Sequence, residues 1–215
     1  MHATHLIVVA LAAAGLVPMG ANAVEIYGGA GTTGAEIGVS ARLSESVVGR
    51  LDYNALNFTR RFTTSNIDYD AKLKASNAGV YLDYFVTGGF RLTGGALIGN
   101  RNIHGTARSI GGSFTLGGVA YPAAAGDTLD FDAKFPTATP YLGIGFGHHL
   151  QAPGLRVYAD AGVAYGRPKL TLSPSASLAS KVNPADLRGE QRSAQEEANG
   201  LRAYPVLKIG ISYRF

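Results

Sequence analysis

The chain has 215 residues, of which 16% are charged, 29 are glycine and none is cysteine or tryptophan. The absence of cysteine excludes disulfides and thiolate metal sites, and a formal net charge of +4 gives no reason to expect nucleic acid as a partner. The charge content is low for a soluble domain, which carries about a quarter charged residues, and is typical of a protein with a large surface in lipid.

The N-terminal region predicts export. Residues 6–17 form an uncharged apolar run that is too short to cross a bilayer as a helix. Ala21 and Ala23 then place small residues at the two positions that a signal peptidase reads. We therefore expect 1–23 to be a cleaved signal peptide and 24–215 to be one mature domain. No later segment holds about twenty consecutive apolar residues, so the exported domain is either a soluble periplasmic protein or a membrane β-barrel.

The mature chain alternates apolar and polar residues over segments of strand length. Leu155, Val157 and Ala159, for example, alternate with Arg156 and Asp160, and neighbouring side chains of a strand point to opposite faces. Eight strands are expected, at about 25–31, 35–43, 47–58, 69–85, 90–103, 128–147, 155–167 and 204–215. The first of them could instead be a kinked extension of the second.

The predicted connections are unequal at the two ends of the strands, which is typical of transmembrane barrels. Short ones are expected at 44–46, 86–89 and 148–154. Long polar loops are expected at 59–68, 104–127 and 168–200.

Three local features interrupt this pattern. A small hairpin is expected around Gly117 and Gly118. Beyond Pro136 the apolar residues change parity, which we interpret as a β-bulge. Residues 184–199 could form a helix capped by Asn183, but they are polar all round, so a partly ordered surface segment is favoured over a partner-binding helix.

The predicted fold is all-β: a closed antiparallel transmembrane β-barrel, with eight strands and long extracellular loops. Closure is required in lipid, because an open sheet edge leaves backbone groups that no water can satisfy. Abundant glycine suits a narrow lumen, where bare backbone makes room for a large side chain opposite. A soluble β-sandwich is the alternative.

Charge decides which face of each strand meets lipid, since an Arg or Lys at the lipid midplane costs roughly 2–4 kcal/mol. We therefore expect the charged residues of the strands to point into the lumen and to form pairs there. The predicted lumen charge network comprises Arg50, Asp52, Lys72, Lys74, Arg91, Asp132, Lys134, Asp160 and Lys208.

The last strand ends on the aromatic residue Phe215, preceded by Gly210 and Tyr213. With the signal peptide, the alternation and the unequal connections, this pattern resembles the small eight-stranded outer-membrane barrels of Gram-negative bacteria, the group of OmpA, OmpX, OmpW and PagP. The resemblance implies a location in the cell outer membrane, contact with lipid and lipopolysaccharide, and recognition of Gly210, Tyr213 and Phe215 by the barrel assembly machinery. It implies a fold more than an activity.

The favoured function is that of a non-enzymatic outer-membrane protein with a structural role or a narrow pore for small solutes. A lipopolysaccharide-modifying enzyme would need a nucleophile and a base, for which only His104 with Thr106, Ser109 or Ser113 is available. No catalytic residue, metal site or cofactor is therefore assigned.

A third possibility is a binding or adhesion barrel. Arg60 and Arg61 are expected at the top of the third strand, where lipopolysaccharide phosphates lie, and guanidinium groups bind phosphate well.

Overall fold

The computed structural model describes residues 24–64, 66–148 and 153–215. The predicted signal peptide lies outside these residues. Within them, no helix is long and apolar enough to span a bilayer.

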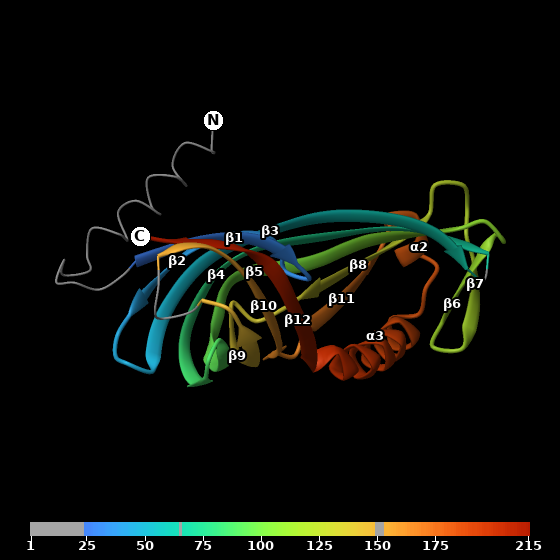
Figure 1. The fold of residues 1–215 in the computed structure, drawn as a ribbon. Coiled ribbons are helices and arrows are strands. Elements are labelled where there is room, and N and C mark those ends of the chain that lie inside the picture. Colours follow the sequence, from blue (N-terminus) through green and yellow to red (C-terminus); the bar gives the residue numbers. More distant parts are fainter. Residues whose placement is uncertain (1–23, 65, 149–152) are drawn as a thin grey trace.

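Most of the described chain is antiparallel sheet (Figure 1). Eight strands form a closed hydrogen-bonded ring in the order β1–β2–β3–β4–β5–β9–β10–β12 and back to β1. The predicted eight-stranded antiparallel barrel is therefore confirmed, and β1 is a strand of its own. The ring consists of β1 (Val24–Gly31), β2 (Gly34–Arg42), β3 (Val47–Thr64), β4 (Ile67–Thr87), β5 (Phe90–Ser109), β9 (Ala138–Phe146), β10 (Gly154–Tyr165) and β12 (Ala203–Arg214).

At one end of the ring the sheet continues past the barrel. β2 pairs with β3 only as far as Ala55, whereas β3 and β4 stay paired up to Thr64 and Ile67. Beyond the residues that pair with β9, β5 pairs with β8 (Thr128–Lys134), and β8 pairs with β11 (Lys169–Pro174). We call this sheet the extension; it comprises 56–64 of β3, 67–75 of β4, 100–109 of β5, β8 and β11.

The extension takes the place of much of the predicted long loops. Residues 59–64 and 67–68 are strand, and β5 runs on to Ser109, because the apolar–polar alternation continues there. The loop prediction for 59–68 is therefore wrong. β11 likewise lies in the loop predicted at 168–200. The hairpin expected within 104–127 is present as β6 (Ser113–Leu116) and β7 (Val119–Pro122).

The β-bulge predicted beyond Pro136 is also wrong. Ala133 in β8 and Thr139 and Tyr141 in β9 are all buried on the inner side, so the same parity faces inward before and after the proline. What changes near the proline is which face is apolar. It is the inner face in the extension and the outer face in the barrel.

The helix considered for 184–199 is present as α3 (Pro184–Asn199), next to α2 (Ala176–Ala179) and the short helix η1 (Gly200–Arg202), instead of the partly ordered segment that was favoured. The Asn183 side chain accepts a hydrogen bond of 2.9 Å from the Ala185 N–H, as a capping residue does. Gln195 in α3 accepts from the Leu170 N–H at 2.8 Å. α3 therefore contacts the free edge of β11 through polar groups.

Tyrosines fill much of the barrel interior by lying over glycines of neighbouring backbone. A Cβ atom on Gly38 would lie 2.4 Å from the Tyr27 ring, and one on Gly95 would lie 2.7 Å from the Tyr81 ring. Further pairs of this kind are Tyr141 with Gly143 and Gly162, and Tyr158 with Gly29 and Gly210.

The adjacent residues Gly94 and Gly95 test this packing. A Cβ on Gly94 would meet only Leu142, at 3.8 Å, whereas one on Gly95 would lie 2.2 Å from the Val80 carbonyl oxygen. We expect Gly95→Ala to lower the free energy of unfolding by about 1–3 kcal/mol through overpacking, and Gly94→Ala to change it by less than about 0.5 kcal/mol. Urea titrations followed by heat-modifiable gel migration measure both, and equal effects would contradict the packing.

Candidate functional site

The centre of the barrel lumen holds a neutral cluster of two arginines and two aspartates. Arg50 Nε lies 2.5 Å from Asp83 Oδ2, and Arg50 Nη1 lies 3.0 Å from Asp160 Oδ2. Arg91 Nε lies 3.3 Å from the same Asp83 oxygen, and Arg91 Nη2 contacts Asp160. All four side chains are buried, and Arg91 is 0% exposed. Each charge therefore has two partners of opposite sign.

A second group of charges surrounds Lys208. Its Nζ atom lies 2.6 Å from Glu36 Oε2 and 2.8 Å from Asp52 Oδ2. The Tyr158 hydroxyl donates to Glu36 at 2.5 Å. We call the two groups together the lumen plug; it comprises Glu36, Arg50, Asp52, Asp83, Arg91, Asp160 and Lys208, packed among Tyr27, Tyr81, Tyr141 and Tyr158.

The structure places five of the nine predicted lumen residues in this plug: Arg50, Asp52, Arg91, Asp160 and Lys208. Glu36 and Asp83 belong to the plug as well, although they were not predicted to do so. Their signal was present, because Glu36 alternates with the outward Ile37, and Asp83 lies between the outward Leu82 and Tyr84.

The prediction that Lys72, Lys74, Asp132 and Lys134 point into the lumen is wrong. The three lysines are exposed on the outer face of the extension. Asp132 lies on the same face, and its Oδ1 is 2.9 Å from His104 Nδ1. These residues lie past the end of the barrel, where the outer face is polar and the inner face is apolar.

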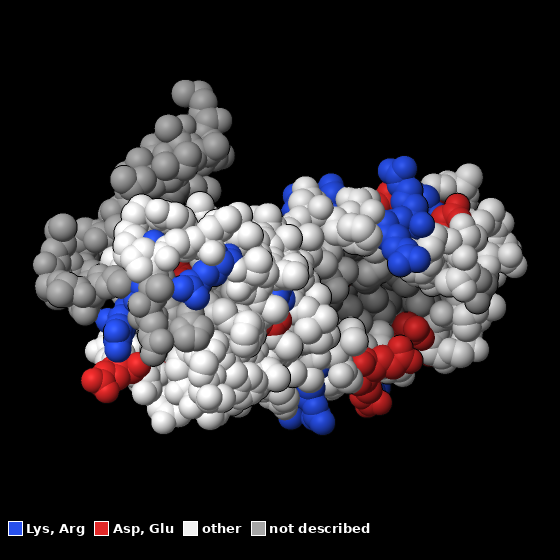
Figure 2. Space-filling view, in the orientation of Figure 1, with Lys and Arg blue, Asp and Glu red and all other residues white. Residues whose placement is uncertain are grey.

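The outer face of the barrel itself is apolar and uncharged. Within 26–41, 47–55, 76–84, 90–98, 138–146, 155–165 and 203–213, the outward positions hold no Lys, Arg, Asp or Glu. Large apolar side chains are exposed there, and Leu142 is 73% exposed. Figure 2 shows this part of the surface as mostly white.

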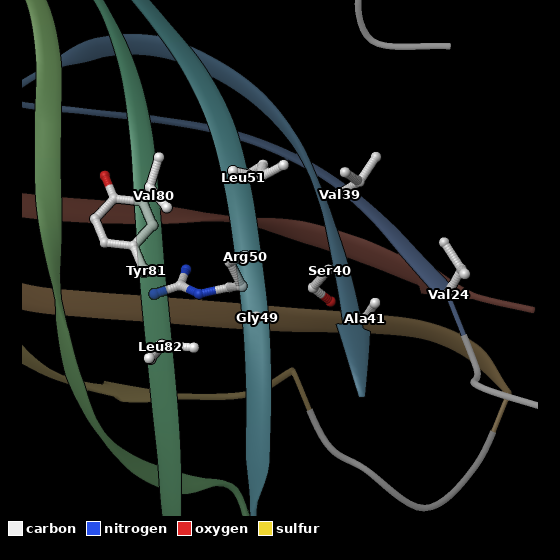
Figure 3. A pocket seen from close by; sticks show the side chains of 10 residues that line it. All are labelled: Val24, Val39, Ser40, Ala41, Gly49, Arg50, Leu51, Val80, Tyr81 and Leu82. Atoms are coloured by element: carbon white, nitrogen blue, oxygen red, sulfur yellow. The ribbon is translucent and has the colours of Figure 1, made fainter. Parts of the chain in front are cut away.

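One shallow depression of about 410 Å³ interrupts the apolar surface where Gly49 has no side chain. Outward Val39, Leu51 and Val80 line it from three neighbouring strands (Figure 3). From β3, the Arg50 guanidinium points the other way, to 5.0 Å from the centre of the Tyr81 ring. Most of its lining residues are aliphatic, so the depression suits lipid chains.

The residues considered for catalysis form hydrogen bonds with different partners. His104 contacts Asp132, while Thr106 donates to a different carboxylate at 2.7 Å. Ser109 donates to the backbone oxygen of Ser113 at 2.7 Å. Among the described residues, no three His, Asp or Glu side chains are placed to hold a metal ion.

Arg60 and Arg61 do not converge on one ligand. Both lie within β3 rather than in a loop, and as neighbours in a strand they point to opposite faces. Arg61 Nε forms an ion pair of 2.9 Å with Asp70 Oδ2 on the outer face. The contact of Arg60 and Arg61 with lipopolysaccharide phosphate therefore stays a prediction for each arginine separately.

The C-terminal aromatic residues lie on the outer face. Tyr213 and Phe215 are exposed, and their rings meet edge to face with centres 5.1 Å apart. Gly210 faces inward beneath Tyr158. The first residues of β1 and the last residues of β12 both lie at this end of the barrel, since Glu25 pairs with Arg214.

Two solved structures share this fold. They are crystal structures of CarO2 and of CarO from Acinetobacter baumannii, with TM-scores of 0.65 and 0.62 and 19% sequence identity each. They match 90% and 93% of this chain and 98% and 99% of their own. The chain has the fold of the CarO β-barrels. This likeness supports the outer-membrane β-barrel class that the sequence resembles; no protein-family model and no curated sequence matches the chain.

At the far end of the extension, a buried carboxylate ties the connection before β8 to the segment after α2. Asp127 accepts from Lys181 Nζ at 2.9 Å and from the Ala124 N–H at 2.8 Å. The hydrogen bond from Lys181 is the main reason that the pKa of Asp127 falls to about 2.

The lumen plug predicts a contrast between two aspartates. Asp160→Asn leaves Arg50 and Arg91 short of a counter-charge, and we expect it to lower the free energy of unfolding by about 3–5 kcal/mol. Asp132→Asn removes an exposed pair with His104, and we expect a loss of no more than about 1 kcal/mol. Urea titration of the two variants measures the difference, and a similar loss for both would contradict the assignment of Asp160 to the plug.

The Asp127 contact predicts a pH dependence. A pKa lowered from 3.8 to about 2 means that the stabilisation is present above about pH 4 and is lost as the pH falls through about 2. Carboxyl ¹³C shifts should titrate near 2 in the wild-type protein and nearer 3.8 in Lys181→Met. Identical midpoints would show that Lys181 does not hold this carboxylate.

Proposed function

We propose that the chain is an integral protein of the Gram-negative outer membrane, non-enzymatic, whose barrel is closed to solutes. The observation that carries this proposal is the lumen plug. The interior of an eight-stranded barrel is just filled by side chains, and here paired charges and four tyrosines fill it.

A narrow pore through this lumen is disfavoured by the cost of opening it. A solute would have to separate Arg50 and Arg91 from Asp83 and Asp160, and breaking a buried pair by removing one partner costs about 3–5 kcal/mol. In a ring of this width, the separated charges would contact other side chains and not bulk water. The plug therefore favours an anchoring role for the barrel over a passage.

The membrane location is supported by the uncharged outer face of the barrel, which we call the belt. It is also supported by the unequal ends of the barrel. The ring strands turn within a few residues at 43–46 and 88–89, at the end where β1 begins and β12 ends. Export by the predicted signal peptide at 1–23 would deliver the chain to the periplasm. Recognition of Gly210, Tyr213 and Phe215 by the barrel assembly machinery would then insert it among outer-membrane lipid and lipopolysaccharide.

A binding role outside the membrane is the second candidate, and the extension favours it. Five strand segments project past the belt and carry a polar outer face and an apolar inner face. In an otherwise sealed barrel, this is the part of the molecule that a ligand can reach.

Conductance and location test the main proposal. In planar bilayers the refolded mature protein should give no channel events, because the plug leaves no water-filled path. In cells the protein should fractionate with outer membranes and migrate faster on gels without heating than after heating. Steady single-channel conductance of the wild-type protein would overturn the sealed barrel, and recovery in the soluble periplasmic fraction would overturn the membrane location.

A further inference from the structure

The inner face of the extension is apolar but only partly covered. Two successive cross-strand rows place mostly apolar side chains inward; we call the apolar ones the inner trough, and they are Phe58, Leu73, Ile103 and Leu170, then Ala71, Phe131 and Leu172. The exposed Arg60 ends the second row on β3. Inward residues of the barrel are buried, whereas Phe58 is 54% exposed and its neighbours in the trough are mostly half-buried.

The far end of the trough is closed by other elements. Ala107 on β5 packs in one apolar cluster with Phe114 and Leu116 of β6 and Leu178 of α2. Between this cluster and the barrel the surface is hollowed, with the extension on one side and α3 on the other (Figure 2). The trough is therefore open at its side and capped at its end.

An unpaired cation lies at the floor of the trough, where the extension meets the barrel. Arg101 is 6% exposed, and its guanidinium carbon lies 5.4 Å from the centre of the Phe135 ring and 5.7 Å from that of Tyr204. Its Nη2 donates to Thr139 at 2.6 Å, while Nε and Nη1 have no acceptor among the described residues. In that part of the chain no carboxylate forms an ion pair with Arg101, unlike Arg50 and Arg91.

A buried cation without a counter-charge is costly, and a buried donor without an acceptor adds to that cost. Positions of this kind are found where a ligand supplies the missing group. Here the missing group is an anion, and the next inward row beside Arg101 is apolar, with Ile103, Leu73 and Phe58 on three neighbouring strands that lie about 4.8 Å apart.

We propose that Arg101 and the inner trough bind a long-chain carboxylate of the fatty-acid type. The carboxylate lies against Arg101 and accepts from its free N–H groups, after the half-buried Phe135 ring moves aside. The aliphatic chain lies along Phe58, Leu73 and Ile103. This inference deepens the binding role proposed for the extension and rests on it, but it does not depend on whether the lumen conducts.

The test uses the full mature protein in neutral maltoside micelles with radiolabelled dodecanoate, and empty micelles as the blank. We expect saturable binding of one dodecanoate per chain. Acetate supplies the head alone and dodecanol the tail alone, so neither should displace the label at concentrations where unlabelled dodecanoate does. Dodecyl phosphate distinguishes the other source of an anionic head, a phosphate-bearing lipid.

Arg101→Gln should weaken dodecanoate binding about tenfold or more, the loss of one charge-assisted contact. The matched control is Arg108→Gln on the same strand, because Arg108 is exposed on the outer face and should not affect binding. Phe58→Asn alters the tail site on β3, two strands away from Arg101, and should weaken dodecanoate binding as well. Heat-modifiable migration checks that each variant is folded.

Several results would overturn the proposal. They are binding no greater than to empty micelles, equal affinity in Arg101→Gln, or displacement by dodecanol as effective as by dodecanoate. Stronger displacement by dodecyl phosphate would assign the site to a phosphate-headed lipid and overturn the carboxylate assignment. If Arg101→Gln does not fold, Phe58→Asn and the competition series decide alone. A silent bilayer with no dodecanoate binding would remove this inference and leave the sealed barrel intact.

Discussion

The narrowness of a closed eight-stranded ring is the constraint on which the rest of the structure depends. Every inward side chain meets others from across the ring, so large groups must face bare backbone and charges must face opposite charges. Gly145 shows both requirements, because a Cβ there would lie 2.7 Å from the Arg91 guanidinium and 2.2 Å from an Asp160 oxygen. The same crowding that makes the barrel stable leaves little room for passage.

The strands pass through two environments without changing which residues face inward. In β4 the odd-numbered residues point inward throughout, as Asp83 and Tyr81 in the barrel and as Leu73 and Tyr69 in the extension. Inside the belt the outer face must be apolar, and past the belt it must be polar. The inversion of the faces therefore marks the boundary of the membrane along the strand.

Two kinds of buried arginine follow from this arrangement. Arg50 and Arg91 lie where four strands bring two aspartates within ion-pair distance, so their charges serve the structure. Arg101 lies ten residues further along β5 than Arg91, where the extension begins and its neighbours are aromatic rings. The first pair seals the lumen, and the single cation gives the extension a place for an anion.

Features that depend on local order follow from the amino-acid sequence alone. Alternation predicted the strands and the lipid face of β3, β5, β10 and β12, and Asn183 with Pro184 indicated where a helix over 184–199 would start. Only the tertiary structure shows which charged residues of the strands face the lumen and which face outward. Lys72 and Arg50 alternate with apolar residues in the same way, and only the point where pairing with β2 ends shows that Lys72 lies past the barrel.

Ring closure also decided the partners, since Arg50 and Asp160 are 110 residues apart. The unpaired state of Arg101 was equally hidden, because its neighbours come from β9, β12 and the connection between β8 and β9. Alternation with a period of two indicates on which face of a strand a residue lies. It does not record how high along the barrel that residue lies or what stands across the lumen from it, and those are set by register and closure.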